Sequence, residues 1–169
     1  MRVLCCLDGQ NVEQISGAVS SFLSMKDLTL GLLYVVDSGP QADMERQRGR
    51  LFRSHELARP RLEQMHQAEQ EAAQTVLEEG ERYLNGAEVL RREGRPEREI
   101  VNCAAEWRAD LIVICPRSPQ DRNLELGPKS VGHVARFVLD HAPCPVLLVR
   151  SLMWEQFPID PKPPKPPER

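Results

Sequence analysis

Short apolar runs alternate with segments of helical periodicity along most of the chain, and this alternation restricts the possible folds more than any other feature. The clearest run, Leu111 to Ile114, has no polar side at all. Such a run is typical of a central parallel strand that helices cover on both faces. Strands that alternate with helices imply parallel pairing through right-handed crossovers. The chain is therefore predicted to be an α/β protein with a parallel sheet.

The expected elements follow one another in the order βαβαβαβαβ. Strands are expected at residues 3–7, 28–36, 87–90, 110–115 and 146–149, each ending near a turn or breaker. Helices are expected to begin at Val12, after Pro60, at Gly94-Arg95-Pro96 and, after a loop to about Pro128, near Val131. Residues 41–59 carry no clear pattern and are interpreted as a mobile or partly helical lid.

The end of the chain differs from the rest in composition. Residues 155–169 contain six of the fourteen prolines and no apolar stripe. We therefore predict a folded domain over residues 1–151, long enough to bury a core, and a proline-rich, disordered tail over residues 152–169. The alternative for the tail is a ligand for a proline-reading domain.

Charge and cysteine content argue against several classes of protein. The formal net charge of -3 is untypical of a general nucleic-acid binder. The apolar runs are too short to span a membrane, and the first one ends at Asp8, too early for a secretory signal. The five cysteines include no C-x-x-C pair and are expected to be small apolar side chains of a cytoplasmic protein. A bridge between Cys5 and Cys6 would be strained, because adjacent strand residues face opposite sides.

Four segments together resemble the universal stress protein family. They are Leu7-Asp8-Gly9, Leu32-Leu33-Tyr34-Val35-Val36-Asp37, Gly94-Arg95-Pro96 followed by Ala109-Asp110-Leu111-Ile112-Val113-Ile114, and the stretch from Val138 to Val149. The resemblance covers about residues 1–150. It implies a doubly wound five-stranded sheet of order 3-2-1-4-5 with helices on both faces, and a homodimer formed partly by Val146 to Val149. It also implies ATP, AMP or another adenine nucleotide as ligand, with Asp8 contacting the adenosine part and Val35 lining the adenine pocket.

The family's phosphate signature, G-x2-G-x9-G-[ST], is degraded here. Its first two glycines fall at Cys115 and Ser118, Gly132 matches the third, and His133 takes the hydroxyl position. In that signature, glycines let the backbone approach the phosphates at a helix N-terminus. Losing two hydrogen bonds to a charged group costs roughly 3–6 kcal/mol, or about two to four decades in affinity. Weak or altered nucleotide binding is therefore expected.

The resulting candidate nucleotide site combines the strand ends with the start of the last helix. It consists of Asp8, Gly9, Val35, Cys115, Arg117, Ser118, Gly132, His133 and Val134. Ser118 and positive charges such as Arg117 are possible substitutes for the lost contacts, as are Arg122 and Lys129. Several of these residues also have a simpler interpretation: Val35 and Cys115 suit core packing, Arg122 and Lys129 suit a solvated loop, and His133 suits an exposed first turn of the helix. No Ser-His-Asp set and no metal-ligand spacing is evident, so neither enzyme activity nor a metal is predicted.

Three functions remain open at this point. The leading hypothesis is a cytoplasmic, dimeric stress-response or signalling module that binds an adenine nucleotide weakly. The alternative is a non-nucleotide-binding dimeric interaction module of the same fold, which would use residues 41–84 and the tail. The third is an enzyme of the adenine nucleotide alpha hydrolase-like superfamily. That function needs a glycine- or serine-rich loop after the first strand, which Asp8-Gly9-Gln10-Asn11-Val12 does not supply.

Overall fold

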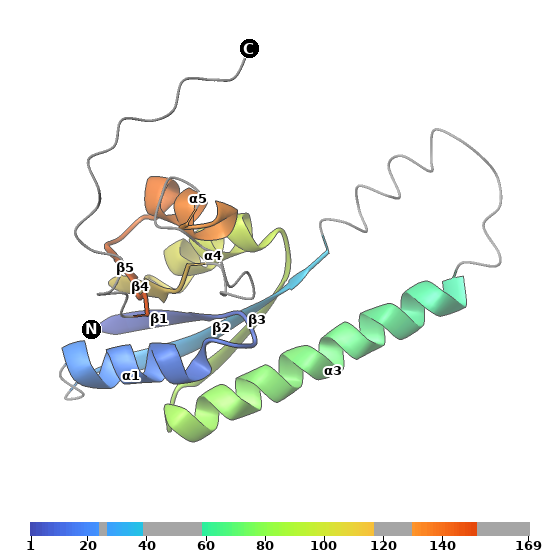
Figure 1. Ribbon diagram of the computed structural model, residues 1–169, viewed down its shortest axis with the longest axis horizontal. Coiled ribbons are helices and arrows are strands. Elements are labelled where there is room, and N and C mark those ends of the chain that lie inside the picture. The colour runs from blue at the N-terminus through green and yellow to red at the C-terminus, as the bar shows by residue number, and fades with distance from the viewer. Residues whose placement is uncertain (24–26, 39–58, 117–129, 152–169) are drawn as a thin grey trace, which may run out of the picture.

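The computed structural model describes residues 1–23, 27–38, 59–116 and 130–151, with the side chains of residues 59–66 excepted (Figure 1). Its strands are β1 (Arg2–Leu7), β2 (Thr29–Asp37), β3 (Glu88–Gly94), β4 (Leu111–Ile114) and β5 (Val146–Leu148). Its helices are α1 (Val12–Phe22), α3 (Arg59–Tyr83), α4 (Pro96–Glu106) and α5 (His133–His141). The five strands form one parallel sheet of order β3-β2-β1-β4-β5, which confirms the predicted topology.

Helices cover both faces of this sheet, so the described residues form two apolar cores, one on each face. Helices α1 and α3 lie on one face and α4 and α5 on the other (Figure 1). The two cysteines of β1 show the division, because Cys5 packs in the α1 and α3 core while Cys6 packs in the α4 and α5 core. Their side chains thus point to opposite faces, as adjacent residues of a strand must.

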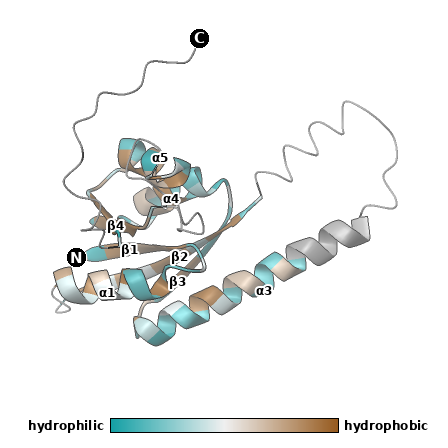
Figure 2. Ribbon diagram, viewed as in Figure 1, coloured by the Kyte–Doolittle hydropathy of each residue, from teal (hydrophilic) through white to brown (hydrophobic). Residues whose placement is uncertain are grey.

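The central strands are buried on both sides, as their unbroken apolar runs predict. Residues Val3–Leu7 of β1 and Ile112–Ile114 of β4 are all buried. In Figure 2 these central strands are largely hydrophobic, whereas hydrophilic and hydrophobic residues are mixed along the helices. Each helix therefore contributes an apolar stripe to a core and keeps its polar side away from it.

Strand β3 is longer than the predicted 87–90. It continues through Arg91, Arg92 and Glu93 to Gly94, in parallel register with β2 up to the pair Asp37 and Gly94. Charged side chains concealed this extension, because most β3 side chains are partly or fully exposed. The length of this strand is determined by backbone pairing with β2 and not by hydrophobicity, and charges are common on edge strands.

Helix α3 approaches the sheet closely at Gly80. A Cβ atom at this position would lie 2.9 Å from Cδ1 of Leu7 and 3.0 Å from Cδ1 of Leu32. The buried stripe of the helix includes Ala73, Leu77 and Gly80, whereas the neighbouring Ala72 is exposed. Phe22, the last residue of α1, is 73% exposed.

Two of the predictions concern segments that the structure does not describe. The proline-rich tail at residues 152–169 and most of the predicted lid, residues 41–58, lie outside the described residues. Residue 59 already belongs to α3. In the described ranges, none of the helices combines the length and the apolar character that crossing a membrane requires.

Candidate functional site

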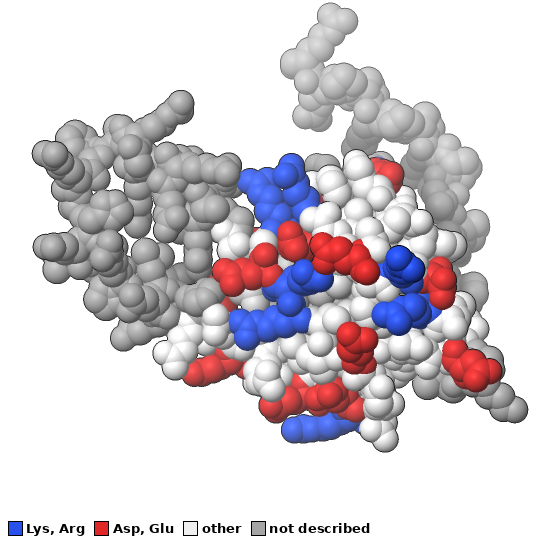
Figure 3. Space-filling model, turned by 180° about the vertical axis from the view of Figure 1, so that it is seen from behind, with Lys and Arg blue, Asp and Glu red and all other residues white. Residues whose placement is uncertain are grey.

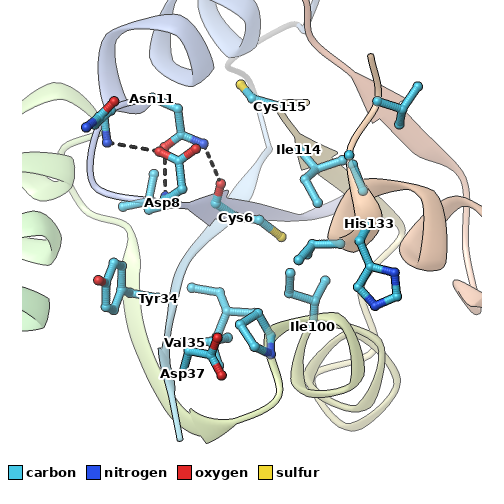
Figure 4. A pocket seen from close by; sticks show the side chains of 18 residues that line it. Cys6, Asp8, Asn11, Tyr34, Val35, Asp37, Ile100, Ile114, Cys115 and His133 are labelled. Atoms are coloured by element: carbon cyan, nitrogen blue, oxygen red, sulfur yellow. Dashed lines mark hydrogen bonds between the residues drawn. The ribbon is translucent and has the colours of Figure 1, made fainter. Parts of the chain in front are cut away.

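A cleft of about 880 Å³ lies at the carboxyl ends of the strands (Figure 4). Its lining comes from β1, β2 and β4, from the turn after β1, and from the first turns of α4 and α5. From β1 the chain continues through α1 to β2, which pairs with one side of β1. Strand β4 pairs with the other side, so the strand order reverses at β1. Open α/β sheets bind ligands at such a switch point. The volume falls in the range of about 300–1,000 Å³ that is typical of small-molecule sites.

The turn between β1 and α1 is held by the buried side chain of Asn11. Its Oδ1 accepts a hydrogen bond from the Asp8 backbone N–H at 3.0 Å, and its Nδ2 donates to the Cys6 carbonyl at 3.0 Å. Gly9 has a φ of 93°, a conformation that favours glycine. The Gln10 N–H then donates to Oδ1 of Asp8 at 2.9 Å. The carboxylate of Asp8 is therefore oriented by its own turn.

One wall of the cleft is apolar. It is lined by Leu33 and Val35 of β2, Pro96 and Ile100 of α4, and Ile114 of β4. Ile100 and Ile114 are buried in the α4 and α5 core, and Val35 is half-buried against it. This wall presents a surface on which a flat, weakly polar group can pack.

Carboxylates and a phenol form the opposite rim. Asp8 and Asp37 are exposed at or just after the carboxyl ends of β1 and β2, and Tyr34 lies near them in the lining (Figure 4). Burial raises the pKa of the Tyr34 phenol, and the negative charges of Asp8 and Glu69 raise it further. Tyr34 is therefore neutral at physiological pH and offers an O–H donor beside two carboxylate acceptors.

The N-terminus of α5 forms the far side of the cleft. Gly132 is the N-cap with a φ of 79°, and the lining continues with His133 and Val134. The first N–H groups of a helix lack intrahelical partners and carry a partial positive charge. His133 is largely exposed, and its Nε2 lies 3.7 Å from Oε1 of Glu97 in the first turn of α4. A carboxylate therefore stands beside the only titratable side chain that α5 contributes to the described lining.

The thiol of Cys115 lies just after β4 and is buried beside the turn. Burial raises its pKa to about 11, the charge of Asp8 adds to this, and a hydrogen bond with Asn11 opposes it. Burial also raises the pKa of Cys6 well above that of an ordinary thiol. Both thiols are protonated at neutral pH, and the thiolate is the nucleophilic form. Neither is therefore suited to nucleophilic chemistry in this state.

The structure brings most of the predicted site residues together. Six of them line this one cleft: Asp8, Val35, Cys115, Gly132, His133 and Val134. Gly9 is not among the lining residues but forms the turn that presents Asp8. Arg117 and Ser118, together with Arg122 and Lys129, lie outside the described residues. That these residues bind a nucleotide stays a prediction.

Sequence reasoning missed several cleft residues, among them Asn11, Tyr34, Asp37 and Ile100. It also missed Glu97, which lies beside the cleft residue His133. Asp37 had a usable signal, because it ends the second strand just as Asp8 follows the first. Asn11 and Glu97 had none, since their roles depend on contacts with other elements. Among the described residues, no three His, Cys, Asp or Glu side chains are grouped so that they could hold a metal ion.

Charges of both signs are mixed on the face of the molecule shown in Figure 3. Acidic and basic side chains lie next to one another there, and Arg92 pairs with Glu106 at 2.5 Å. A nucleic-acid-binding face would instead show a continuous basic surface. This face therefore does not have the charge pattern of such a binder.

Comparisons with known proteins agree with this architecture. The structure is similar to the universal stress protein UspA from Lactobacillus plantarum, with 20% identity and a TM-score of 0.65 over 89% of this chain and 97% of that one. It is also similar to an Arabidopsis thaliana universal stress protein family protein solved with AMP bound, with 18% identity and a TM-score of 0.57 over 95% and 97%. A protein of the same family from Burkholderia pseudomallei shares 22% identity and a TM-score of 0.51 over 89% and 96%.

At these identities the similar structures establish the fold alone. A search of curated protein sequences gave no match. The profile of the Universal stress protein family, by contrast, matches residues 1–150, which is nearly the whole described domain. The chain therefore belongs to the universal stress protein family.

Proposed function

We propose that this protein is a stress-response or signalling module that binds an adenine nucleotide in the cleft with altered phosphate contacts. The observation that carries this proposal is the meeting of Asp8, Val35 and the start of α5 around one cleft of ligand size. The Arabidopsis thaliana relative, which was crystallised with AMP bound, supports the ligand class. The degraded glycine signature supports the altered phosphate contacts.

The proposed binding mode assigns each part of the ligand to one part of the cleft. The adenine packs on the apolar wall that includes Val35 and Ile100. The ribose hydroxyls donate to the carboxylate of Asp8, an arrangement that acidic residues at strand ends commonly adopt. The phosphate lies at the N-terminus of α5, near the N–H groups that follow Gly132. Arg117 and Ser118 stay predicted phosphate contacts.

The proposed output is a change in surface or dimer contacts on ligand binding and not a chemical reaction. A cytoplasmic location is part of the proposal. All five cysteines are free thiols, four of them buried. Free thiols are usual in the reducing cytoplasm, whereas secreted proteins tend to pair them.

Calorimetry on the wild-type protein and on the variant Asp8→Asn tests the binding mode. Asp8→Asn is expected to lower the affinity for both AMP and adenosine by about tenfold, because a hydrogen bond to a charged acceptor is stronger than one to a neutral acceptor. The control is Asp140→Asn, which removes the same charge from an exposed position near the end of α5. Equal affinities in the Asp8 variant and the wild type would contradict the ribose contact. No heat with any adenine ligand at millimolar concentration would reject the proposed function.

We also propose a homodimer through the edge formed by β5. In the described part of the sheet β5 pairs only with β4, and its residues Val146–Leu148 are all partly exposed. An apolar edge strand of this kind tends to pair with another chain. In sedimentation experiments the wild-type protein is expected to have about twice the 19.2 kDa mass of one chain. The variant Val146→Lys is expected to be a monomer.

The matched control is Val89→Lys on β3, the other edge of the described sheet, where Val89 is 41% exposed. This variant should remain a dimer. A monomeric wild type, or dimers of both variants, would rule out the β5 interface. A dimer that binds no nucleotide is the result expected from the alternative function, a non-nucleotide-binding interaction module.

A further inference from the structure

Two carboxylates line the cleft, and a third lies beside the lining residue His133. Asp8 and Asp37 lie along one side in Figure 4, opposite His133. The third, Glu97, belongs to the first turn of α4 and is only 9% exposed. Its Oε1 lies 3.7 Å from Nε2 of His133. A buried carboxylate therefore lies next to the first residue of α5, the helix whose N-terminus would meet the phosphates of a nucleotide.

The charge at this place is unfavourable for a polyphosphate. A helix N-terminus supplies roughly half a positive charge, whereas Glu97 supplies a full negative one. Each additional phosphate adds negative charge near Glu97, and a buried charge is screened less by salt than an exposed one. His133 offsets the carboxylate only when it is protonated. The electrostatic cost that the described residues impose on binding therefore rises from adenosine through AMP to ATP.

The contacts with the nucleoside part do not carry this cost. Ribose hydroxyls are donors, and the Asp8 carboxylate is an acceptor that the Gln10 N–H already orients at 2.9 Å. The apolar wall that includes Val35 and Ile100 is indifferent to the number of phosphates. The base and ribose thus contribute similarly for every adenine ligand, and the α5 end of the cleft decides among them.

We infer that this cleft selects adenosine or its monophosphate over ATP, and that Glu97 is the residue that determines this specificity. The inference rests on the proposed function and deepens it. Glu97 acts by repelling added phosphate charge, so neutralising it should change the affinity for ATP and leave that for adenosine almost unaffected.

The test measures dissociation constants for adenosine, AMP and ATP in EDTA, so that no Mg²⁺ offsets the phosphate charge. Wild-type protein is expected to bind adenosine and AMP more tightly than ATP. In Glu97→Gln the ratio of the ATP to the adenosine dissociation constant should fall about fivefold, as expected for one charge at a distance of several ångströms in a partly polar site. The adenosine constant itself should change less than about twofold.

Glu106→Gln is the matched control. It removes the same charge from the other end of α4, where Glu106 pairs with Arg92 on an exposed surface. The ratio in this variant should equal the wild-type ratio. Thermal unfolding of each variant reports whether it is folded, and the wild-type order of affinities tests the inference even without a variant.

The possible results distinguish failure of this inference from failure of the proposed function. ATP binding as tightly as adenosine to the wild type would overturn the inference and leave nucleotide binding intact. An unchanged ratio in folded Glu97→Gln would remove the role of Glu97. Failure of all three ligands to bind at millimolar concentration would overturn the proposed function, and this inference with it.

Discussion

Val35→Trp is expected to abolish adenine-nucleotide binding and to leave the protein folded. Val35 is half-buried on β2 and lines the apolar wall together with Ile100 of α4. An indole at this position would occupy the space in which the adenine packs. Burial of a base against such a wall contributes about 3 kcal/mol at roughly 25 cal/mol per Å². The dissociation constants for adenosine and AMP should therefore rise by about a hundredfold or more.

Val89→Trp is the matched control for this experiment. Val89 lies on the neighbouring strand β3, is 41% exposed and does not line the cleft. Calorimetry should give wild-type affinities for this variant, and thermal unfolding should show that both variants are folded. Wild-type affinity in folded Val35→Trp would mean that the base binds elsewhere, and the proposed binding mode would be wrong.

Asn11→Leu is expected to lower the free energy of unfolding by about 2–4 kcal/mol. Leucine has nearly the shape of asparagine but neither donates nor accepts a hydrogen bond. The substitution leaves the Cys6 carbonyl and the Asp8 N–H without their partner, and each unsatisfied buried group costs about 1–3 kcal/mol. Adenosine binding should weaken as well, because the turn that holds Asp8 loses its anchor.

Urea denaturation measures this loss, and Gln14→Leu is its control. Gln14 also bridges distant segments, since its Nε2 donates to the Val149 carbonyl at 3.2 Å, but the site is only partly buried. Water can replace that bond, so the control should lose less than about 1 kcal/mol. An equally small loss in Asn11→Leu would show that the turn is held by other contacts.

The elements of the fold were largely predictable because their signals are local. Apolar runs such as Leu111 to Ile114 and helical stripes such as that of α4 arise within a few residues of one another, where periodicity reports burial. The strand order was available only through resemblance to the universal stress protein family, because alternation alone does not say which strands are neighbours. The prediction for β3 was too short, because the charged half of this strand is recognisable only from its pairing with β2.

The candidate site divides in the same way. Counting along the chain was enough to predict that Asp8 follows a buried strand and that Gly132 and His133 lie near the start of the last helix. The packing of separate elements was needed to place Glu97 3.7 Å from His133 and to let Asn11 link Asp8 to Cys6. The reason is physical: hydrophobic periodicity is set by the next few residues, whereas the charge and hydrogen bonding of a cleft depend on which side chains separate elements bring together.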